Sequence, residues 1–98
     1  MKKSPQPSRK TAEILAVQAL AFIAEEPERL GLFVSATGIA PEQIRDAARE
    51  PDFLLGVLEH MLGDENLLVA FAGSAGVDPA EIARARDVLG KAWERDPP

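Results

Sequence analysis

The sequence contains no cysteine, only one histidine and only one tryptophan among its 98 residues. Without cysteine the chain can form neither a disulfide nor a thiolate metal site, which fits the reducing cytosol. Long hydrophobic runs are also missing. The apolar stretch at residues 12–24 is interrupted by Glu13 and Gln18, and it is shorter than the roughly 20 residues of a membrane-spanning helix. Since it also lacks the cleavage site of a signal peptide, we expect a cytoplasmic protein with no membrane span.

Charge is distributed unevenly along the chain. Residues 1–10 contain four basic side chains and no acidic one, whereas residues 11–98 contain 7 basic and 16 acidic side chains. An acidic body repels nucleic acid and anionic membranes at long range. The prolines and serines among the first ten residues predict a flexible basic arm, which serves either solubility or contact with a partner.

The length and composition predict one globular domain. Of the 98 residues, 46% are hydrophobic and 28% are charged, which is normal for a folded protein and enough for one modest core. We expect this domain to cover residues 11–95, between the arm at residues 1–10 and a short tail at residues 96–98.

Helix-start and helix-stop signals divide the domain into about six short helices. Prolines such as Pro27 and Pro51 suit the first helical position, and Gly38 and Gly76 suit the left-handed stop. No segment alternates with the period of two that a half-buried strand shows. The sequence therefore predicts an all-α, compact helical bundle, with helices over about 11–24, 27–36, 41–49, 51–62, 65–75 and 79–90.

The chain also contains an internal repeat with an offset of 38 residues. Matching positions share apolar residues, the turn glycine and the proline that starts a helix: Leu20 with Leu58, Leu30 with Leu68, Phe33 with Phe71, Gly38 with Gly76, Pro41 with Pro79, Ile44 with Ile82, and Ala47 with Ala85. This pattern predicts two similar three-helix halves, about 11–49 and 52–90. Because neither half can bury its apolar face alone, we expect the two to pack on each other.

Two predicted helices are apolar on almost every side. Residues 11–24 include only three polar side chains, and residues 67–75 include only one. Such helices belong in the centre of a domain or under a partner. Gly31, Gly56 and Gly73 lie inside predicted helices, where each costs about 1 kcal/mol relative to alanine, so we expect another backbone to cross closely there.

Three stretches resemble a known family: QALAFIAEEPERLGLFVSATG at 18–38, PDFLLGVLEHMLGDENLLVAFA at 51–72, and GVDPAEIARA at 76–85. Together they resemble a bacterial family of proteins of unknown function, number 3572, and the resemblance covers about residues 11–90. It implies a small helical bacterial protein without an assigned activity, and it carries over no catalytic residue.

The residues that bear chemistry do not form a recognisable site. His60 and Asp64 are an i, i+4 pair, but a metal site needs three or four ligands, and the chain has no second histidine and no cysteine. The clustered carboxylates stand at predicted helix starts, where negative charge complements the helix dipole. They lie at residues 25–28, at residues 64–65, and at Asp78 and Glu81. We therefore expect no metal, no cofactor and no catalytic residue, and a protein that is not an enzyme.

Protein interaction is the function that these features favour. We expect a small non-enzymatic interaction or adaptor domain that binds another protein or itself. Trp93 either docks the C-terminal helix onto the core or is the candidate anchor for a partner, because tryptophan is over-represented at binding hot spots. Basic residues of the arm are the other candidate contacts: Lys2, Lys3, Arg9 and Lys10.

Two other functions stay open. Residues 32–49 and 69–86 each read as helix, glycine turn and helix, which resembles a DNA-binding helix-turn-helix. However, each candidate recognition helix has a net charge of −1, whereas contacts with phosphates should dominate affinity, so we do not expect nucleic acid as the partner. A carrier of a small apolar ligand is the second alternative, and it requires an internal cavity between the two halves.

Overall fold

The computed structural model describes the backbone of residues 6–95 and the side chains of residues 6–91. Within residues 6–95 the chain folds into six α-helices and one 3-10 helix, with no strand, which confirms the predicted all-α class. These elements are α1 (Arg9–Ala24), α2 (Pro27–Thr37), η1 (Pro41–Gln43), α3 (Ile44–Ala47), α4 (Pro51–Leu62), α5 (Glu65–Ala75) and α6 (Pro79–Arg95).

The helix boundaries follow local chemistry that the sequence displays. Ser8 is the N-cap of α1, and its hydroxyl oxygen accepts a hydrogen bond from the backbone N–H of Thr11 at 3.0 Å. α2 ends at Gly38 with a φ of 75°, and α5 ends at Gly76 with a φ of 70°. A residue with a side chain is strained in this left-handed region, whereas glycine is not. The predicted stops at both glycines are therefore confirmed.

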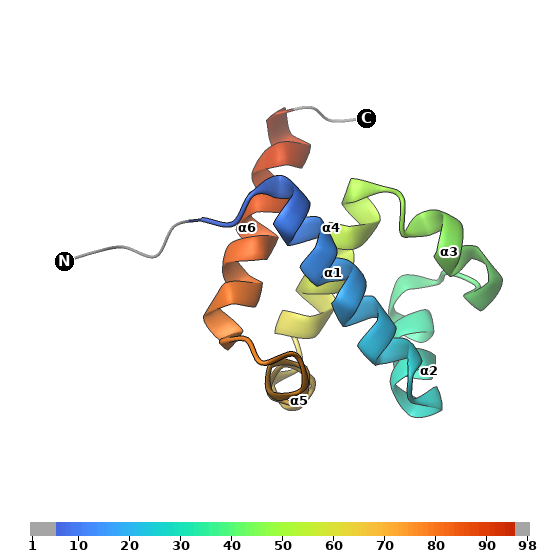
Figure 1. Ribbon diagram of the computed structural model, residues 1–98. Coiled ribbons are helices and arrows are strands. Elements are labelled where there is room, and N and C mark those ends of the chain that lie inside the picture. Colours follow the sequence, from blue (N-terminus) through green and yellow to red (C-terminus); the bar gives the residue numbers. More distant parts are fainter. Residues whose placement is uncertain (1–5, 96–98) are drawn as a thin grey trace.

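Three helices form the centre of the bundle. α1, α4 and α6 pack against one another, and α2 and α5 lie at the lower end of the molecule in Figure 1. The face of α1 that points inward carries Ala12, Ala16 and Ala19, all with no exposed surface. Small side chains let helix axes approach closely. The radius of gyration of 13.1 Å equals the roughly 13 Å expected for a single domain of this size.

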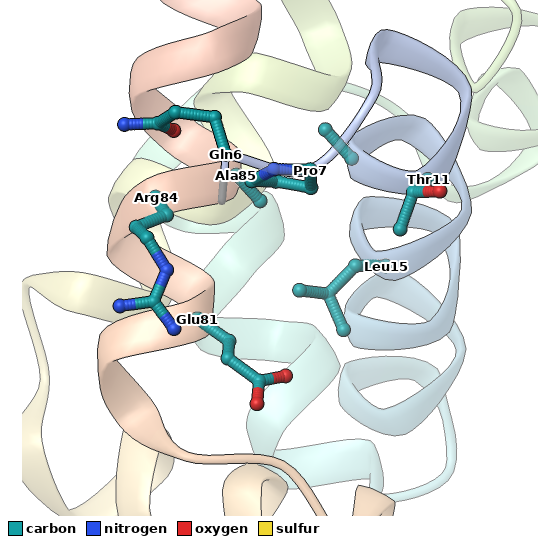
Figure 2. A pocket seen from close by; sticks show the side chains of 8 residues that line it. Gln6, Pro7, Thr11, Leu15, Glu81, Arg84 and Ala85 are labelled. Carbon is teal, nitrogen blue, oxygen red and sulfur yellow. The ribbon is translucent and has the colours of Figure 1, made fainter. Parts of the chain in front are cut away.

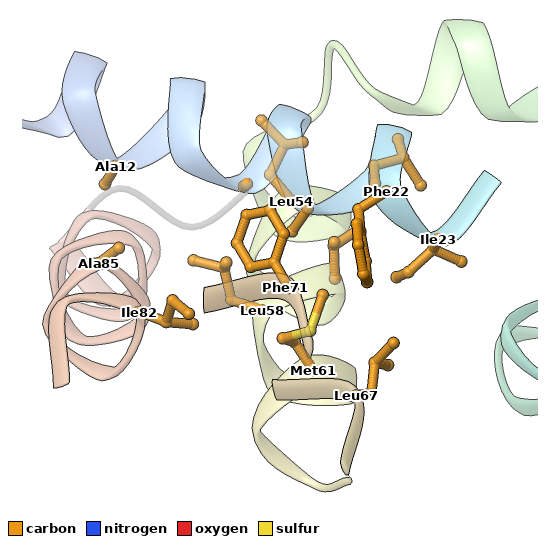
Figure 3. Packing of buried hydrophobic residues seen from close by; sticks show 14 of the residues in the cluster. Ala12, Phe22, Ile23, Leu54, Leu58, Met61, Leu67, Phe71, Ile82 and Ala85 are labelled. Carbon is orange, nitrogen blue, oxygen red and sulfur yellow. The ribbon is translucent and has the colours of Figure 1, made fainter. Parts of the chain in front are cut away.

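Aromatic contacts attach the outer helices to this centre, and Figure 3 shows the one that involves α5. Phe71 of α5 packs against Phe22 of α1 with ring centroids 5.5 Å apart. Phe33 is the one buried side chain of α2, and it lies edge-on to Phe53 of α4 at 5.8 Å. α2 is thus anchored mainly through a single phenylalanine.

The prediction of two similar three-helix halves is not confirmed. The first two helices of each half do agree in their stops, and α2 and α5 have 11 residues each. The third elements differ, because α3 has only 4 residues and contacts mainly η1, whereas α6 has 17 residues and packs against α1 and α4. The predicted helix over 41–49 is therefore too long. Residues 41–43 form the 3-10 helix η1, and Ala48 and Arg49 lie in a turn after α3. The segment cannot continue past Glu50, because Pro51 restricts the residue before it and Glu50 is extended with a ψ of 125°.

The expectation for the glycines inside helices is wrong. A Cβ atom added at Gly31, Gly56 or Gly73 would meet nothing within 4 Å beyond its own helix. No other backbone crosses at these positions, and the three glycines do not mark close helix contacts.

The predicted basic arm overlaps the first helix. Arg9 and Lys10 form the first turn of α1, two residues before the predicted start, while Lys2 and Lys3 lie outside the described residues. Trp93 belongs to the last turns of α6, and its side chain lies outside the described part. Among the described helices, none combines the length and the apolar character that crossing a bilayer requires.

Candidate functional site: two grooves beside the first helix

The first helix exposes apolar side chains that the core does not use. Ile14 is 49% exposed and Val17 is 44% exposed, although both belong to a helix whose other face is fully buried. The two residues are three positions apart, so their side chains lie next to each other on one face of α1. Among the described side chains of α1, α4 and α6, Ile14 and Val17 are the large apolar ones that stand exposed.

These side chains line a groove of about 350 Å³, which we call the α1–α4 groove. Ile14, Val17 and Gln18 form its wall on α1, and Leu54 of α4 forms the facing wall. The turn between α3 and α4 closes one side with Ala48 and Arg49. The segment that connects α3 to α4 thus contributes to the groove together with the two helices.

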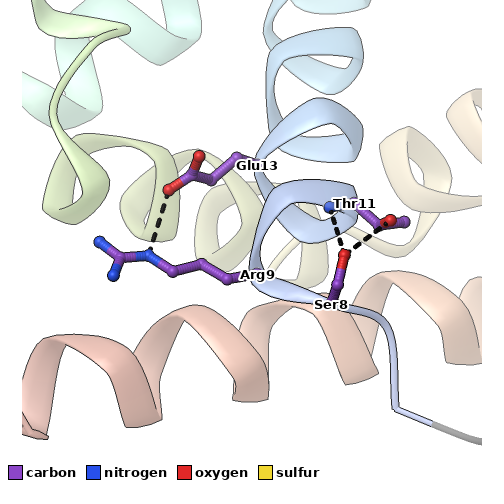
Figure 4. Close-up of polar contacts among 4 residues, drawn as sticks. All are labelled: Ser8, Arg9, Thr11 and Glu13. Atoms are coloured by element: carbon purple, nitrogen blue, oxygen red, sulfur yellow. Dashed lines mark hydrogen bonds and ion pairs between the residues drawn. The ribbon is translucent and has the colours of Figure 1, made fainter.

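Basic side chains flank the α1–α4 groove. Lys10 and Glu13 line it from the first turns of α1. Glu13 is already engaged, because its Oε2 lies 3.3 Å from the Nε of Arg9, as Figure 4 shows. Neither Lys10 nor Arg49 forms an ion pair with any side chain in the range 6–91. A positive groove is thus set in a chain whose residues 11–98 are predominantly acidic.

A second groove, of about 360 Å³, lies between the start of α1 and α6. Thr11 and Leu15 line it from α1, and Glu81 and Arg84 line it from α6. Leu15 and Glu81 project into the space between the two helices (Figure 2). This α1–α6 groove is more polar than the first, and its apolar contribution from α1 is limited to Leu15 and the buried Ala12. It is an open surface feature between segments from the two predicted halves.

The predicted pair of His60 and Asp64 is divided between two structural roles. The ring of His60 lies edge-on to that of Phe33 with centroids 5.1 Å apart. The carboxylate of Asp64 caps α5 by accepting a hydrogen bond from the backbone N–H of Leu67 at 3.2 Å. Within the described residues, no three His, Cys, Asp or Glu side chains gather as metal ligands would.

The other acidic side chains also serve helix starts. Asp78 accepts a hydrogen bond from the backbone N–H of Ala80 at 2.8 Å. The backbone N–H of Glu81 donates to the backbone carbonyl of Asp78 at 2.8 Å. Glu28 stands in the first turn of α2. These carboxylates complement helix dipoles in the way that the sequence predicts.

The two helix-turn-helix candidates differ in the structure. In the first, the would-be recognition helix is reduced to η1 and the four residues of α3. In the second, α6 buries Ile82, Ala85 and Leu89 in the core. Arg86 of α6 forms an ion pair with Asp87, in which the Nε of Arg86 lies 2.9 Å from the Oδ1 of Asp87.

The structure places the predicted contact residues in different environments. Lys10 lines the α1–α4 groove, and Arg9 lies beside it in its ion pair with Glu13. Sequence reasoning missed Ile14 and Val17. Their signal was present in the apolar composition of residues 11–24, because a helix that is apolar on almost every side must leave some of those side chains outside the core.

These features define a small all-helical protein with grooves on two sides of its first helix. The sequence model of the family described as "Protein of unknown function (DUF3572)" matches residues 9–92, so the chain belongs to this family. The resemblance seen in the sequence is thereby confirmed. No curated protein and no solved structure matches the chain.

Proposed function

We propose that this chain is a small non-enzymatic interaction domain, which binds another protein in the cytoplasm of a bacterial cell through its α1–α4 groove. The observation that carries the proposal is the pair Ile14 and Val17. Both are apolar, each is nearly half exposed, and both line a groove instead of filling the core. Apolar surface of this kind, with a polar border, is typical of sites where proteins bind one another.

The chemistry of the two side chains supports this use. Isoleucine and valine are β-branched and have one strongly preferred χ1 rotamer in a helix, so little side-chain entropy is lost when a partner covers them. Covering the exposed parts of both would contribute about 2–3 kcal/mol of apolar burial. Since association itself costs several kcal/mol, the partner must add matching apolar side chains of its own.

Leu54 supplies a buried, well-packed facing wall for such a partner. It is 4% exposed and belongs to the continuous core, so a side chain that enters the α1–α4 groove would rest on rigid structure. A preformed apolar surface lowers the cost of ordering on binding. The groove is thus a better candidate than an isolated exposed leucine such as Leu32, which lines neither of the two grooves described above.

The test compares two double variants that remove similar amounts of exposed apolar surface. Ile14→Ser with Val17→Ser changes the groove, and Leu32→Ser with Val69→Ser is the matched control. Leu32 and Val69 are 65% and 57% exposed. Tagged wild type and both variants are used to capture proteins from the native host, and captured proteins are then titrated against purified wild type by calorimetry.

We expect a protein that binds wild type and the control directly but does not bind the groove variant. A partner that binds the groove variant as tightly as wild type would remove the basis of the proposal. Circular dichroism and urea unfolding check that both variants keep the native fold.

Three further measurements address the other functions. Light scattering shows a dimer if a second copy fills the groove, and that dimer should then disappear in the groove variant. An electrophoretic shift with DNA at low salt tests the helix-turn-helix alternative. Native mass spectrometry of the purified protein tests for a retained apolar ligand.

A further inference from the structure

We propose that the partner of the α1–α4 groove is an amphipathic helix with acidic residues beside its apolar face. This inference rests on the proposed function and specifies the chemistry of the partner. It combines the shape of the apolar surface with the charges that surround it, and the two are argued in turn.

The apolar surface has the spacing of a helix-in-groove site. Ile14 and Val17 form a short ridge along one wall, and Leu54 faces them from α4. A groove between two helices accepts the side chains of a third helix at positions i, i+3 or i+4, and i+7. The volume of about 350 Å³ is enough for a few apolar side chains, which is what one face of one helix supplies.

The charges select an acidic helix. Lys10 and Arg49 line the groove, and neither is paired with another residue of the described part. Among the described residues that line the groove, Glu13 is the only acidic one, and its carboxylate is engaged by Arg9 at 3.3 Å. Carboxylates on a partner would meet two cations that form no ion pair within the described residues, and complementary charge of this kind raises the association rate and sets specificity.

The start of α1 adds to the positive potential. α1 has no acidic residue in its first turn, whereas α2, α4, α5 and α6 each have one. Cations in the first turn oppose the helix dipole and weaken the helix. A carboxylate placed beside Lys10 would relieve this repulsion, so a bound acidic partner also stabilises the start of α1.

The same charges disfavour a second copy of this chain. In a two-fold symmetric dimer, the groove of one copy would face the groove of the other. Lys10 and Arg49 would then approach cations of the partner copy, with only the engaged Glu13 to compensate. Like charges across an interface weaken association.

The test uses three synthetic helical peptides of about 18 residues, long enough to form a helix in water. They share leucines at positions i, i+3, i+4 and i+7, and they carry Glu, Gln or Lys at the positions beside this apolar face. Binding to the full-length protein is measured by fluorescence anisotropy at about 20 mM and at about 500 mM NaCl, because salt screens exposed charges.

We expect the Glu peptide to bind at least about tenfold more tightly than the Lys peptide, with the Gln peptide between them. The advantage of the Glu peptide should shrink at high salt. The double variant Lys10→Glu with Arg49→Glu should reverse the order and favour the Lys peptide. The matched control is Arg45→Glu with Lys91→Glu, which changes the net charge equally at exposed positions that do not line the groove and should keep the order of wild type.

The possible results separate the two proposals. If all three peptides bind equally well and all lose binding in the Ile14→Ser, Val17→Ser variant, the groove binds apolar helices and the acidic preference is wrong. If the control reverses the order as fully as the groove variant does, the preference comes from net charge and the inference is also wrong. If none of the peptides binds at up to about 1 mM, the inference fails, while the capture experiment still decides the proposed function.

Discussion

The segments that start at Pro41 and at Pro79 have the same local signals and different tertiary roles. Each proline follows a left-handed glycine by three residues and begins a helical segment. The first segment becomes η1 and the four residues of α3, at the edge of the molecule in Figure 1, whereas the second becomes α6, which packs against α1 and α4. Their equivalent isoleucines show the difference, because Ile82 is fully buried and Ile44 is only partly buried.

The difference teaches how far a repeated sequence specifies a repeated structure. Pro51 starts α4 and restricts the residue before it, so the first segment must end by Glu50. No proline interrupts residues 80–95, and α6 continues long enough to reach both α1 and α4. Turn signals repeat faithfully, but the length of each helix decides which one enters the core. The short α3 then leaves beside α1 the groove that we propose as the binding site.

The largest expected effect comes from truncating the two equivalent isoleucines. Ile82→Ala removes a fully buried side chain and should lower the free energy of unfolding by about 2–5 kcal/mol. Ile44→Ala should lower the free energy of unfolding by only about 1 kcal/mol, because the side chain of Ile44 is partly exposed. Urea unfolding followed by circular dichroism measures both. Equal losses would mean that the two segments contribute alike, against the asymmetry described here.

The next effect concerns the helix stops at Gly38 and Gly76, where the two predicted halves agree. Gly38→Ala and Gly76→Ala should each lower the free energy of unfolding by about 1–2 kcal/mol, because alanine is strained at a positive φ. A Cβ atom meets nothing within 4 Å at either site, so strain of the backbone is the only cost. Asparagine tolerates this conformation, and Gly38→Asn is therefore the control that should recover part of the loss. An effect at only one of the two glycines would show that the stops are not equivalent.

A third comparison uses Arg29 and Leu67, which are equivalent under the offset of 38 residues. Leu67 is buried, whereas Arg29 lies over the ring of Phe22 at 4.0 Å from its centroid and donates a hydrogen bond to the Phe22 carbonyl oxygen. Arg29→Ala should lower the free energy of unfolding by about 1 kcal/mol, as expected for one cation–π contact and one hydrogen bond. Arg29→Lys should lower the free energy of unfolding by a smaller amount than Arg29→Ala, since lysine keeps the charge but does not stack on a ring as arginine does. Arg45→Ala is the control, and thermal unfolding should show little change for it.

The smallest effect is a gain in stability. Gly31→Ala in α2 and Gly73→Ala in α5 should each raise the free energy of unfolding by about 0.5–1 kcal/mol, because alanine favours helices and nothing crowds either position. The two gains should add in the double variant, since the sites lie on different helices. Denaturant midpoints measure them. A loss at either site would indicate a contact that the structure does not contain.

Most of the helices could be predicted from local signals. Ser8, the turn glycines and the prolines at helix starts act through their own backbone and their nearest neighbours, so the sequence displays them directly. The third helix of the first half is shorter than predicted, because residues 41–43 form a 3-10 helix and residues 48–49 form a turn. The prediction of close packing at the glycines inside helices is wrong, because such packing depends on distant segments.

The candidate site was only partly predictable. Lys10 and Arg9 were identified from charge alone, and both lie at the α1–α4 groove or beside it. Ile14, Val17 and Arg49 could not be identified from the sequence. The first helix is apolar on almost every side, so periodicity cannot tell which side will face the core. That choice depends on Ala12, Ala16 and Ala19, whose small side chains let the neighbouring helices approach.

The sequence by itself determined the all-helical class, the stops at Gly38 and Gly76, the helix starts at the prolines, and the excess of apolar surface on the first helix. These properties arise from interactions within a few residues along the chain. Only the tertiary structure decided that α6 enters the core, that α3 stays at the edge, and that Ile14 and Val17 face a basic groove. Such outcomes depend on which surfaces of distant segments pack together most closely. No local sequence pattern contains that information.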